Sequence, residues 1–86
     1  MKSQSFVITD AQGLHARPCA SIVAAVRNFD STVTMTYQGT VFDASNPIAL
    51  MTAGVACNDE IIFTVSGNDE DKAMESLEEL IKKELT

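Results

Sequence analysis

Few residues in this sequence can bind a metal or form a redox pair. The chain contains one histidine, His15, and two cysteines, Cys19 and Cys57, which lie far apart and form no Cys-x-x-Cys motif. A structural zinc site usually needs four nitrogen or sulfur ligands, often in closely spaced pairs. Neither a zinc site nor a dithiol redox motif is therefore indicated. We expect both cysteines to be buried thiols, because free cysteine behaves as a small apolar residue.

Long hydrophobic runs are also missing. No stretch approaches the roughly 18 consecutive apolar residues of a membrane span. Residues 1–10 lack the basic start and the apolar run of a secretion signal. We therefore expect a soluble, cytoplasmic protein that does not insert into membranes.

Basic residues are scarce: six Lys and Arg stand against twelve Asp and Glu, for a net charge of −6. This balance argues against binding to nucleic acid or to anionic lipid. The acids crowd the last part of the chain, whereas residues 11–29 contain none and residues 44–58 contain no charge of either sign. Because residues 11–29 carry His15, Arg17 and Arg27, we expect a locally positive face beside an uncharged patch, suited to an anionic group and a protein partner.

The chain has 86 residues, of which 45% are hydrophobic. This size fits one globular domain over residues 1–86. A domain so small can hardly enclose a deep catalytic pocket, so any chemistry is expected at the surface. These features favour a carrier or a binding protein over a self-contained enzyme.

Hydrophobic spacing indicates the secondary structure. In residues 16–27 apolar side chains recur at i, i+3, i+4 and i+7, the spacing of a buried helical stripe. In residues 32–37 they alternate with threonines, and Gln38-Gly39 then favours a tight hairpin turn. Asn46 before Pro47 is a favoured helix start. The predicted strands cover residues 5–9, both arms of a hairpin over 32–42 and residues 61–66, and the predicted helices cover 16–27, 47–53 and 69–85.

This order, β-α-β-β-α-β-α, predicts the fold class. Helices that return onto one side of a sheet give an α+β open-faced sandwich. We expect a four-stranded, mostly antiparallel sheet with three helices on one face.

The stretch GLHARP combines an imidazole with the start of a helix. If the helix begins at Ala16, His15 is its N-cap, where unpaired N–H groups and the helix dipole stabilise an anion. Pro18 falls in the first turn, where its missing N–H costs nothing. Gly13 permits a left-handed backbone, and Arg17 supplies donors that match phosphate oxygens.

These positive surroundings should disfavour protonation of His15 and leave a lone pair that can attack phosphorus. We therefore consider His15 a candidate nucleophile that becomes a phosphohistidine and passes the group on. The alternative is that His15 is only a helix cap in a loop. Local sequence shows a plausible anion site and does not show that the anion is covalently bound.

The sequence resembles the HPr family, the histidine-containing phosphocarriers of the bacterial phosphoenolpyruvate-dependent sugar phosphotransferase system. The resemblance rests on GLHARP, on the order of elements, and on DEIIFTVSG and DEDKAMESLEELI near the end of the chain. It implies an open-sandwich fold and no cofactor. It also implies that enzyme I transfers a phosphoryl group to Nδ1 of His15, which passes it to the A domain of a sugar permease. We expect a monomer that carries the group and is not itself an enzyme.

The resemblance also assigns roles to other residues. Arg17, with the backbone of Ala16, matches the phosphate-binding positions. Ile48 and Met51 match an exposed apolar patch that docks partners, although ordinary core packing on a short helix is the alternative. The remaining predicted partner-binding residues are Ala20, which borders that patch, and Arg27.

Two departures from the family pattern bear on function. Asn46 stands where many members have a serine that a kinase phosphorylates, so it keeps a helix cap and lacks the acceptor hydroxyl. Ala24 and Ala49 stand where relatives often have basic residues, which weakens the expected attraction to acidic partners. Two alternatives to sugar transport therefore stay open: a carrier of a regulatory, nitrogen-type branch, and a docking regulator that no longer carries phosphate.

Overall fold

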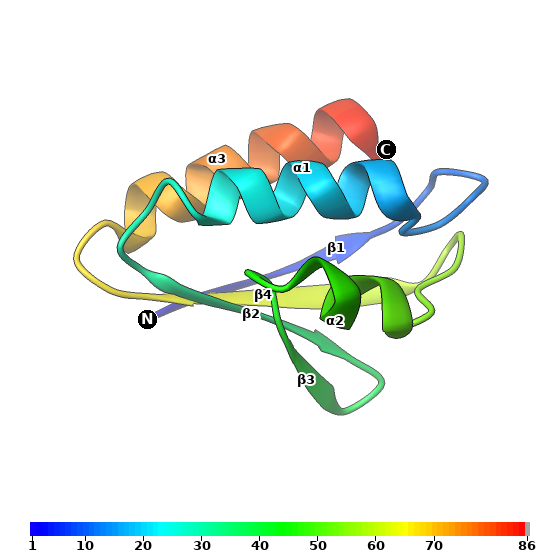
Figure 1. Ribbon diagram of the computed structural model, residues 1–86, viewed down its shortest axis with the longest axis horizontal. Coiled ribbons are helices and arrows are strands. Elements are labelled where there is room, and N and C mark those ends of the chain that lie inside the picture. The colour runs from blue at the N-terminus through cyan, green and yellow to red at the C-terminus, as the bar shows by residue number, and fades with distance from the viewer. Residues whose placement is uncertain (86) are drawn as a thin grey trace.

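Four strands form one sheet in the order β1-β4-β2-β3 (Figure 1). The computed structural model describes residues 1–85. Every neighbouring pair of strands is antiparallel. The elements are β1 (Lys2–Val7), α1 (Ala16–Val26), β2 (Thr32–Tyr37), β3 (Thr40–Asp43), α2 (Pro47–Thr52), β4 (Glu60–Ser66) and α3 (Glu70–Glu84). The predicted element order and antiparallel sheet are confirmed.

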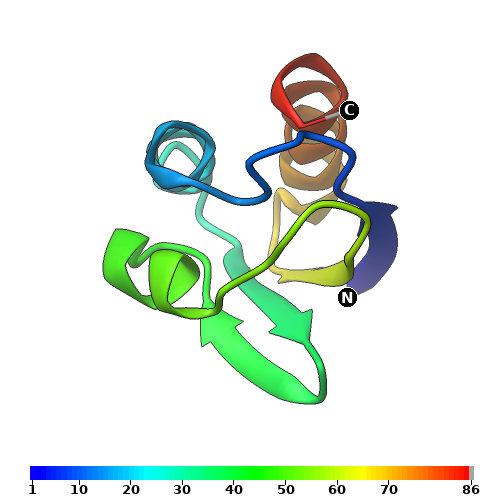
Figure 2. The ribbon, with the colours of Figure 1, turned by 90° about the vertical axis from the view of Figure 1, so that its right-hand side faces the viewer.

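The helices gather on one side of the sheet. Figure 2 shows α1 and α3 side by side above it, and α2 packs against both α1 and β3. The buried side chains alternate along the two central strands: Val33, Met35 and Tyr37 in β2, and Ile61, Phe63 and Val65 in β4. The side chains between them, Thr34 and Thr36 in β2 and Ile62 and Thr64 in β4, lie on the opposite face and are half-buried or exposed. The open-faced sandwich predicted from the sequence is therefore confirmed. Within residues 1–85, no helix is both long enough and apolar enough to cross a bilayer.

A two-residue turn joins β2 to β3. Gln38 and Gly39 have φ angles of 51° and 79°. Positive φ at both central positions is what a type I′ hairpin turn requires, and this turn matches the right-handed twist of the strands. The predicted hairpin is confirmed.

The first strand differs from its prediction. It was predicted over residues 5–9 and is found at Lys2–Val7. Its start is set by the long partner strand, since Lys2 pairs with Val65 across the sheet. Its end is set by competing acceptors: the Ile8 N–H donates to the carbonyl of Asp59, and the next N–H donates to the carbonyl of Leu85. The three helices agree with their predictions to within one residue at each end.

Two loops and the end of α3 meet at one end of the molecule, where α1 begins (Figure 1). The Leu14 N–H donates to the carbonyl of Val55 at 3.0 Å, which joins the β1–α1 loop to the α2–β4 loop. The Thr9 N–H donates to the carbonyl of Leu85 at 2.9 Å, which joins the same loop to the end of α3. The β1–α1 loop is thus held from two sides.

Asp69 fastens the opposite end of the molecule. Its carboxylate accepts hydrogen bonds from the hydroxyl of Ser31 and from the N–H groups of Asp30 and Ser31, at 2.9 Å and 3.0 Å for the two N–H groups. The Ser31 hydroxyl and then the Asp30 N–H hold the pKa of the Asp69 carboxyl below its ordinary value of 3.8. The folded protein therefore favours the ionised form of Asp69.

This shift predicts a pH-dependent effect of Asp69→Asn. A pKa lowered by folding contributes stability above the ordinary pKa, and that stability is lost as the pH falls through the folded-state pKa. We expect Asp69→Asn to be less stable than the unmodified protein at about pH 7 and the difference to narrow at about pH 3, as measured by urea unfolding. The exposed Glu75 provides the control Glu75→Gln, which also removes one carboxylate of α3 but leaves the hydrogen bonds of Asp69 in place. If Asp69→Asn lowered the free energy of unfolding equally at both pH values, the stabilising role of the ionised Asp69 carboxylate would be contradicted.

Candidate functional site

His15 is the N-cap of α1, as the sequence predicts. Its backbone is extended, with φ −91° and ψ −174°, and its carbonyl accepts the first helical hydrogen bond from the Cys19 N–H at 3.1 Å. Within residues 1–85 the imidazole itself makes no capping hydrogen bond. The N–H groups of Ala16 and Arg17 therefore lack an intrahelical partner and face the space in front of the helix. Such a helix start attracts an anion through its N–H groups and its dipole.

A shallow surface depression of about 470 Å³ lies in front of this helix end. Its lining combines the imidazole of His15 and the guanidinium of Arg17 with a short piece of the preceding loop. The side chain of His15 is 28% exposed, so the ring is supported by the protein and still open to solvent. Of the residues predicted to act on phosphate, His15 and Arg17 line this depression, and Ala16 between them is the first residue of α1.

Asp10 is a site residue that the sequence analysis missed. Its Oδ2 atom lies 3.8 Å from Nε2 of His15. The expectation of positive surroundings for His15 is therefore wrong on one side of the ring. A tight turn brings Asp10 back toward the helix, because the Gly13 N–H donates to the Asp10 carbonyl at 2.9 Å. The available signal was the spacing in DAQG, since Asp at the first and Gly at the fourth position favour a type I turn.

Gly13 lets the β1–α1 loop pass close to its neighbour. Its φ is +66°, and a Cβ at this position would lie 2.4 Å from the carbonyl oxygen of Val55 and 2.8 Å from Cα of Ala56. No other residue fits this position without displacing backbone. The hydrogen bond from the neighbouring Leu14 N–H to the Val55 carbonyl depends on this approach.

The two cysteines differ in their environment. Cys19 is fully buried, its thiol donates weakly to the carbonyl of Leu14 at 3.8 Å, and burial raises its pKa to about 11. Cys57 is only half-buried, and its thiol donates to the carbonyl of Thr9 at 3.7 Å. The expectation of a buried thiol is thus correct for Cys19 and wrong for Cys57, which lies on a surface loop.

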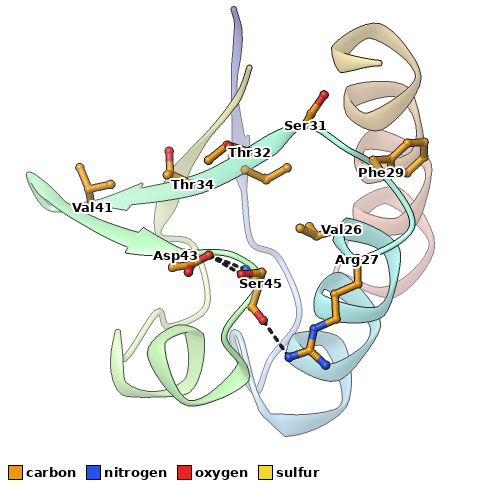
Figure 3. A pocket seen from close by; sticks show the side chains of 10 residues that line it. Val26, Arg27, Phe29, Ser31, Thr32, Thr34, Val41, Asp43 and Ser45 are labelled. Atoms are coloured by element: carbon orange, nitrogen blue, oxygen red, sulfur yellow. Dashed lines mark hydrogen bonds between the residues drawn. The ribbon is translucent and has the colours of Figure 1, made fainter. Parts of the chain in front are cut away.

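Arg27 is not brought to His15. It is the C-cap of α1, so about twelve residues of helical rise, roughly 18 Å, separate it from the N-cap. Figure 3 shows its guanidinium turned toward Ser45, and Nη2 donates to the Ser45 carbonyl at 3.2 Å. Arg27 instead lines a separate hollow of about 540 Å³ between α1 and the β2–β3 hairpin. Ala20 is exposed on α1, one turn after Ala16.

Ile48 and Met51 project from α2 into solvent. Their side chains are 67% and 45% exposed, whereas Leu50 between them is fully buried. The alternative that Ile48 and Met51 are ordinary core residues is therefore wrong. Helices α1 and α2 pack together. The exposed Ala20 therefore lies on the helix next to the one that carries Ile48 and Met51.

Asn46 is the N-cap of α2. Its Oδ1 accepts hydrogen bonds from the N–H groups of Ile48 at 3.0 Å and Ala49 at 3.3 Å, so the predicted cap is confirmed. The adjacent Ser45 donates its hydroxyl to Asp43 Oδ1 at 2.7 Å and its N–H to the same atom at 2.9 Å (Figure 3). These two bonds, the hydroxyl first, hold the pKa of the Asp43 carboxyl below its ordinary value. The side chain of Asn46 and the hydroxyl of Ser45 therefore both help to fix the backbone at the start of α2.

Comparison with known proteins relates this chain to a family. Residues 2–83 match the family model described as the PTS HPr component phosphorylation site. The histidine-containing phosphocarrier protein of Mycoplasma superposes with a TM-score of 0.93 at 26% identity, over 95% of this chain and 93% of that chain. HPr of Thermoanaerobacter tengcongensis superposes with a TM-score of 0.91 at 29% identity, over 96% and 93%. Crh, the catabolite repression protein of Bacillus subtilis, which forms a swapped dimer, superposes with a TM-score of 0.77 at 29% identity, over 100% and 99%.

Proposed function

The chain belongs to the HPr family of phosphotransferase-system (PTS) phosphocarriers, and on this premise we propose that it accepts a phosphoryl group from enzyme I on Nδ1 of His15. It then delivers the group to the A domain of a sugar permease. The observation that carries the proposal is the position of His15, partly exposed at the N-cap of α1 beside Arg17. Family membership and fold support the phosphocarrier role in general, and the named partners are part of the proposal.

The proposed transfer needs little protein machinery. The lone pair of Nδ1 forms a bond to phosphorus while the bond between phosphorus and the donor breaks. The phosphoryl oxygens then lie in front of α1, where the N–H groups of Ala16 and Arg17 and the guanidinium of Arg17 offer positive charge. Phosphoryl transfer depends chiefly on such positioning and charge stabilisation. An open surface suits a carrier, because two different proteins must reach the same nitrogen.

The proposal is tested by phosphorylation in vitro. The protein is incubated with phosphoenolpyruvate and enzyme I, and its intact mass is measured before and after mild acid treatment. One added, acid-labile phosphoryl group supports the proposal, because phosphohistidine hydrolyses in acid whereas phosphoserine survives. Absence of an added group contradicts it.

We further propose that Ala20, Ile48 and Met51 form the docking surface for these partners. An exposed apolar pair on a short helix next to α1 fits a partner that covers the His15 depression. Arg27, at the far end of α1, would act at the rim, where charge influences association rate more than affinity.

Ile48→Glu is expected to weaken this docking. A charge at the centre of an apolar contact should raise the KM for this chain in the enzyme I reaction about tenfold or more. Folding should be unaffected, because the Ile48 side chain is 67% exposed. Val41→Glu is the matched control, since Val41 is 64% exposed on the sheet face opposite the helices. Equal effects of the two substitutions would contradict the assignment of the surface.

A docking regulator is the second candidate function, because this chain also resembles Crh over its full length. Asn46 carries an amide in place of a hydroxyl, so a serine kinase has no acceptor there. A pure docking protein needs neither a nucleophile nor a phosphate-binding arginine, and this chain has both His15 and Arg17. The mass experiment separates the two candidates, and light scattering tests whether this chain is a monomer, as we propose, or a dimer.

A further inference from the structure

We propose that Asp10 is a positioning residue for this transfer: its carboxylate holds the His15 ring in the tautomer that is protonated on Nε2, and so presents the lone pair of Nδ1. The inference rests on the proposed function of His15. Asp10 lies outside the GLHARP motif, and the turn over residues 10–13 brings its side chain to the ring.

The carboxylate of Asp10 is fixed in place. The Asp10 N–H donates to the carbonyl of Leu85 at 3.1 Å, and its carbonyl accepts from the Gly13 N–H at 2.9 Å. Its Oδ1 accepts from the Gln12 N–H at 2.8 Å. With backbone and one carboxylate oxygen bound, the other oxygen, Oδ2, is left beside the imidazole, 3.8 Å from Nε2. The side chains of Asp10 and His15 are 23% and 28% exposed, so neither swings freely in solvent.

This geometry distinguishes the two ring nitrogens. A neutral imidazole carries a proton on one nitrogen and a lone pair on the other. A carboxylate attracts the N–H dipole and repels the lone pair, so the tautomer with the proton on Nε2 is favoured. The distance of 3.8 Å is longer than a hydrogen bond, and the effect is therefore one of charge. The lone pair of Nδ1 is left for phosphorus.

The same arrangement supports both directions of transfer. When Nδ1 bonds to phosphorus, the bond to the donor breaks and its electron pair leaves with the donor, while Nε2 keeps its proton. The ring then carries a positive charge, and part of this charge lies at Nε2–H, the side of the ring that is near Asp10. When the acceptor attacks, the Nδ1–P bond breaks and its electron pair returns to Nδ1. No proton enters or leaves the ring in either step, and the Asp10 carboxylate compensates the transient ring charge.

Asp10→Asn separates charge from loop structure. An Asn side-chain oxygen can still accept from the Gln12 N–H and keep the turn, but it carries no charge. Asp10→Ala removes both. Asp30, exposed in the loop after α1, provides the control Asp30→Asn, which removes one negative charge far from the ring. Backbone amide NMR spectra confirm that each variant keeps the fold.

The first readout is the tautomer, measured from the ¹⁵N shifts of the His15 ring at a pH where the ring is neutral. We expect the proton on Nε2 in the unmodified protein and in Asp30→Asn, and a several-fold larger share of the Nδ1–H form in Asp10→Asn and Asp10→Ala. The second readout is the rate of phosphorylation by enzyme I, which should fall roughly fivefold in both Asp10 variants, as expected for a unit charge about 4 Å away in a mainly aqueous setting.

An unmodified protein with its proton on Nδ1 would overturn the inference. So would an Asp10→Asn protein with unchanged tautomer or unchanged rate. These failures differ from failure of the proposed function, because the tautomer is measured without any partner. If the unmodified protein accepts no phosphoryl group at all, the proposed function itself is wrong and this inference falls with it.

Discussion

Replacing His15 by alanine is expected to abolish phosphoryl transfer to this protein. The substitution removes the imidazole nitrogen that forms the bond to phosphorus, and the rest of the anion site cannot supply a nucleophile. After incubation with phosphoenolpyruvate and enzyme I, the intact mass of His15→Ala should be unchanged, whereas the unmodified protein gains one phosphoryl group. The expected loss is complete, because His15 is the sole histidine of the chain.

The interpretation of this result depends on the variant being folded. His15 makes no side-chain capping bond to α1 within the described residues. Replacing its side chain should therefore change the melting temperature by only a few degrees, as surface substitutions usually do. His15→Gln serves as a second variant that keeps a polar side chain at the N-cap. A phosphoryl group that persists on either folded variant would place the acceptor elsewhere in the chain.

Replacing Gly13 by alanine should have the largest effect on stability. The added Cβ would meet the carbonyl oxygen of Val55 at 2.4 Å and Cα of Ala56 at 2.8 Å, and both are backbone atoms. The left-handed φ of +66° adds a conformational cost of about 1–2 kcal/mol, and overpacking adds about 1–3 kcal/mol. The sum corresponds to a fall in melting temperature of roughly 10–25 °C in a domain of this size, measured by circular dichroism.

Gly39→Ala is the matched control for this prediction. Gly39 also has a left-handed backbone, with φ +79°, but a Cβ there would meet nothing within 4 Å. This control should therefore carry only the conformational cost, about 1–2 kcal/mol. If Gly13→Ala were no less stable than Gly39→Ala, the close contact between the β1–α1 and α2–β4 loops would not be what restricts position 13 to glycine. Gly13→Ala should also slow phosphorylation, because Leu14 and His15 would have to move.

Local sequence patterns predicted most of the fold because each depends on few neighbours. The apolar stripe of α1, the Gln38-Gly39 turn and the Asn46-Pro47 helix start are all decided by residues that are close in sequence. The position of β1 was predicted less well. Its ends depend on the partner strand β4 and on the Leu85 carbonyl, which are distant in sequence.

The candidate site was predictable to a similar extent. The N-cap position of His15 and the nearby Arg17 follow from GLHARP itself. The chemistry assigned to them did not follow from local physics, and it came from resemblance to the HPr family. The distribution of charge along the sequence does not reveal Asp10 as a neighbour of His15, because the turn after β1 returns this carboxylate to the ring. The same distribution places Arg27 near His15, although the length of α1 separates them.

The most direct test of the account is to identify the atom that bears phosphorus. The protein, labelled with ¹⁵N on the His15 ring, is phosphorylated by phosphoenolpyruvate and enzyme I and analysed by ³¹P and ¹⁵N NMR. The account predicts a single phosphoramidate whose phosphorus is coupled to Nδ1 of His15. Coupling to Nε2, a phosphoryl group on another residue, or no phosphoryl group at all would contradict it.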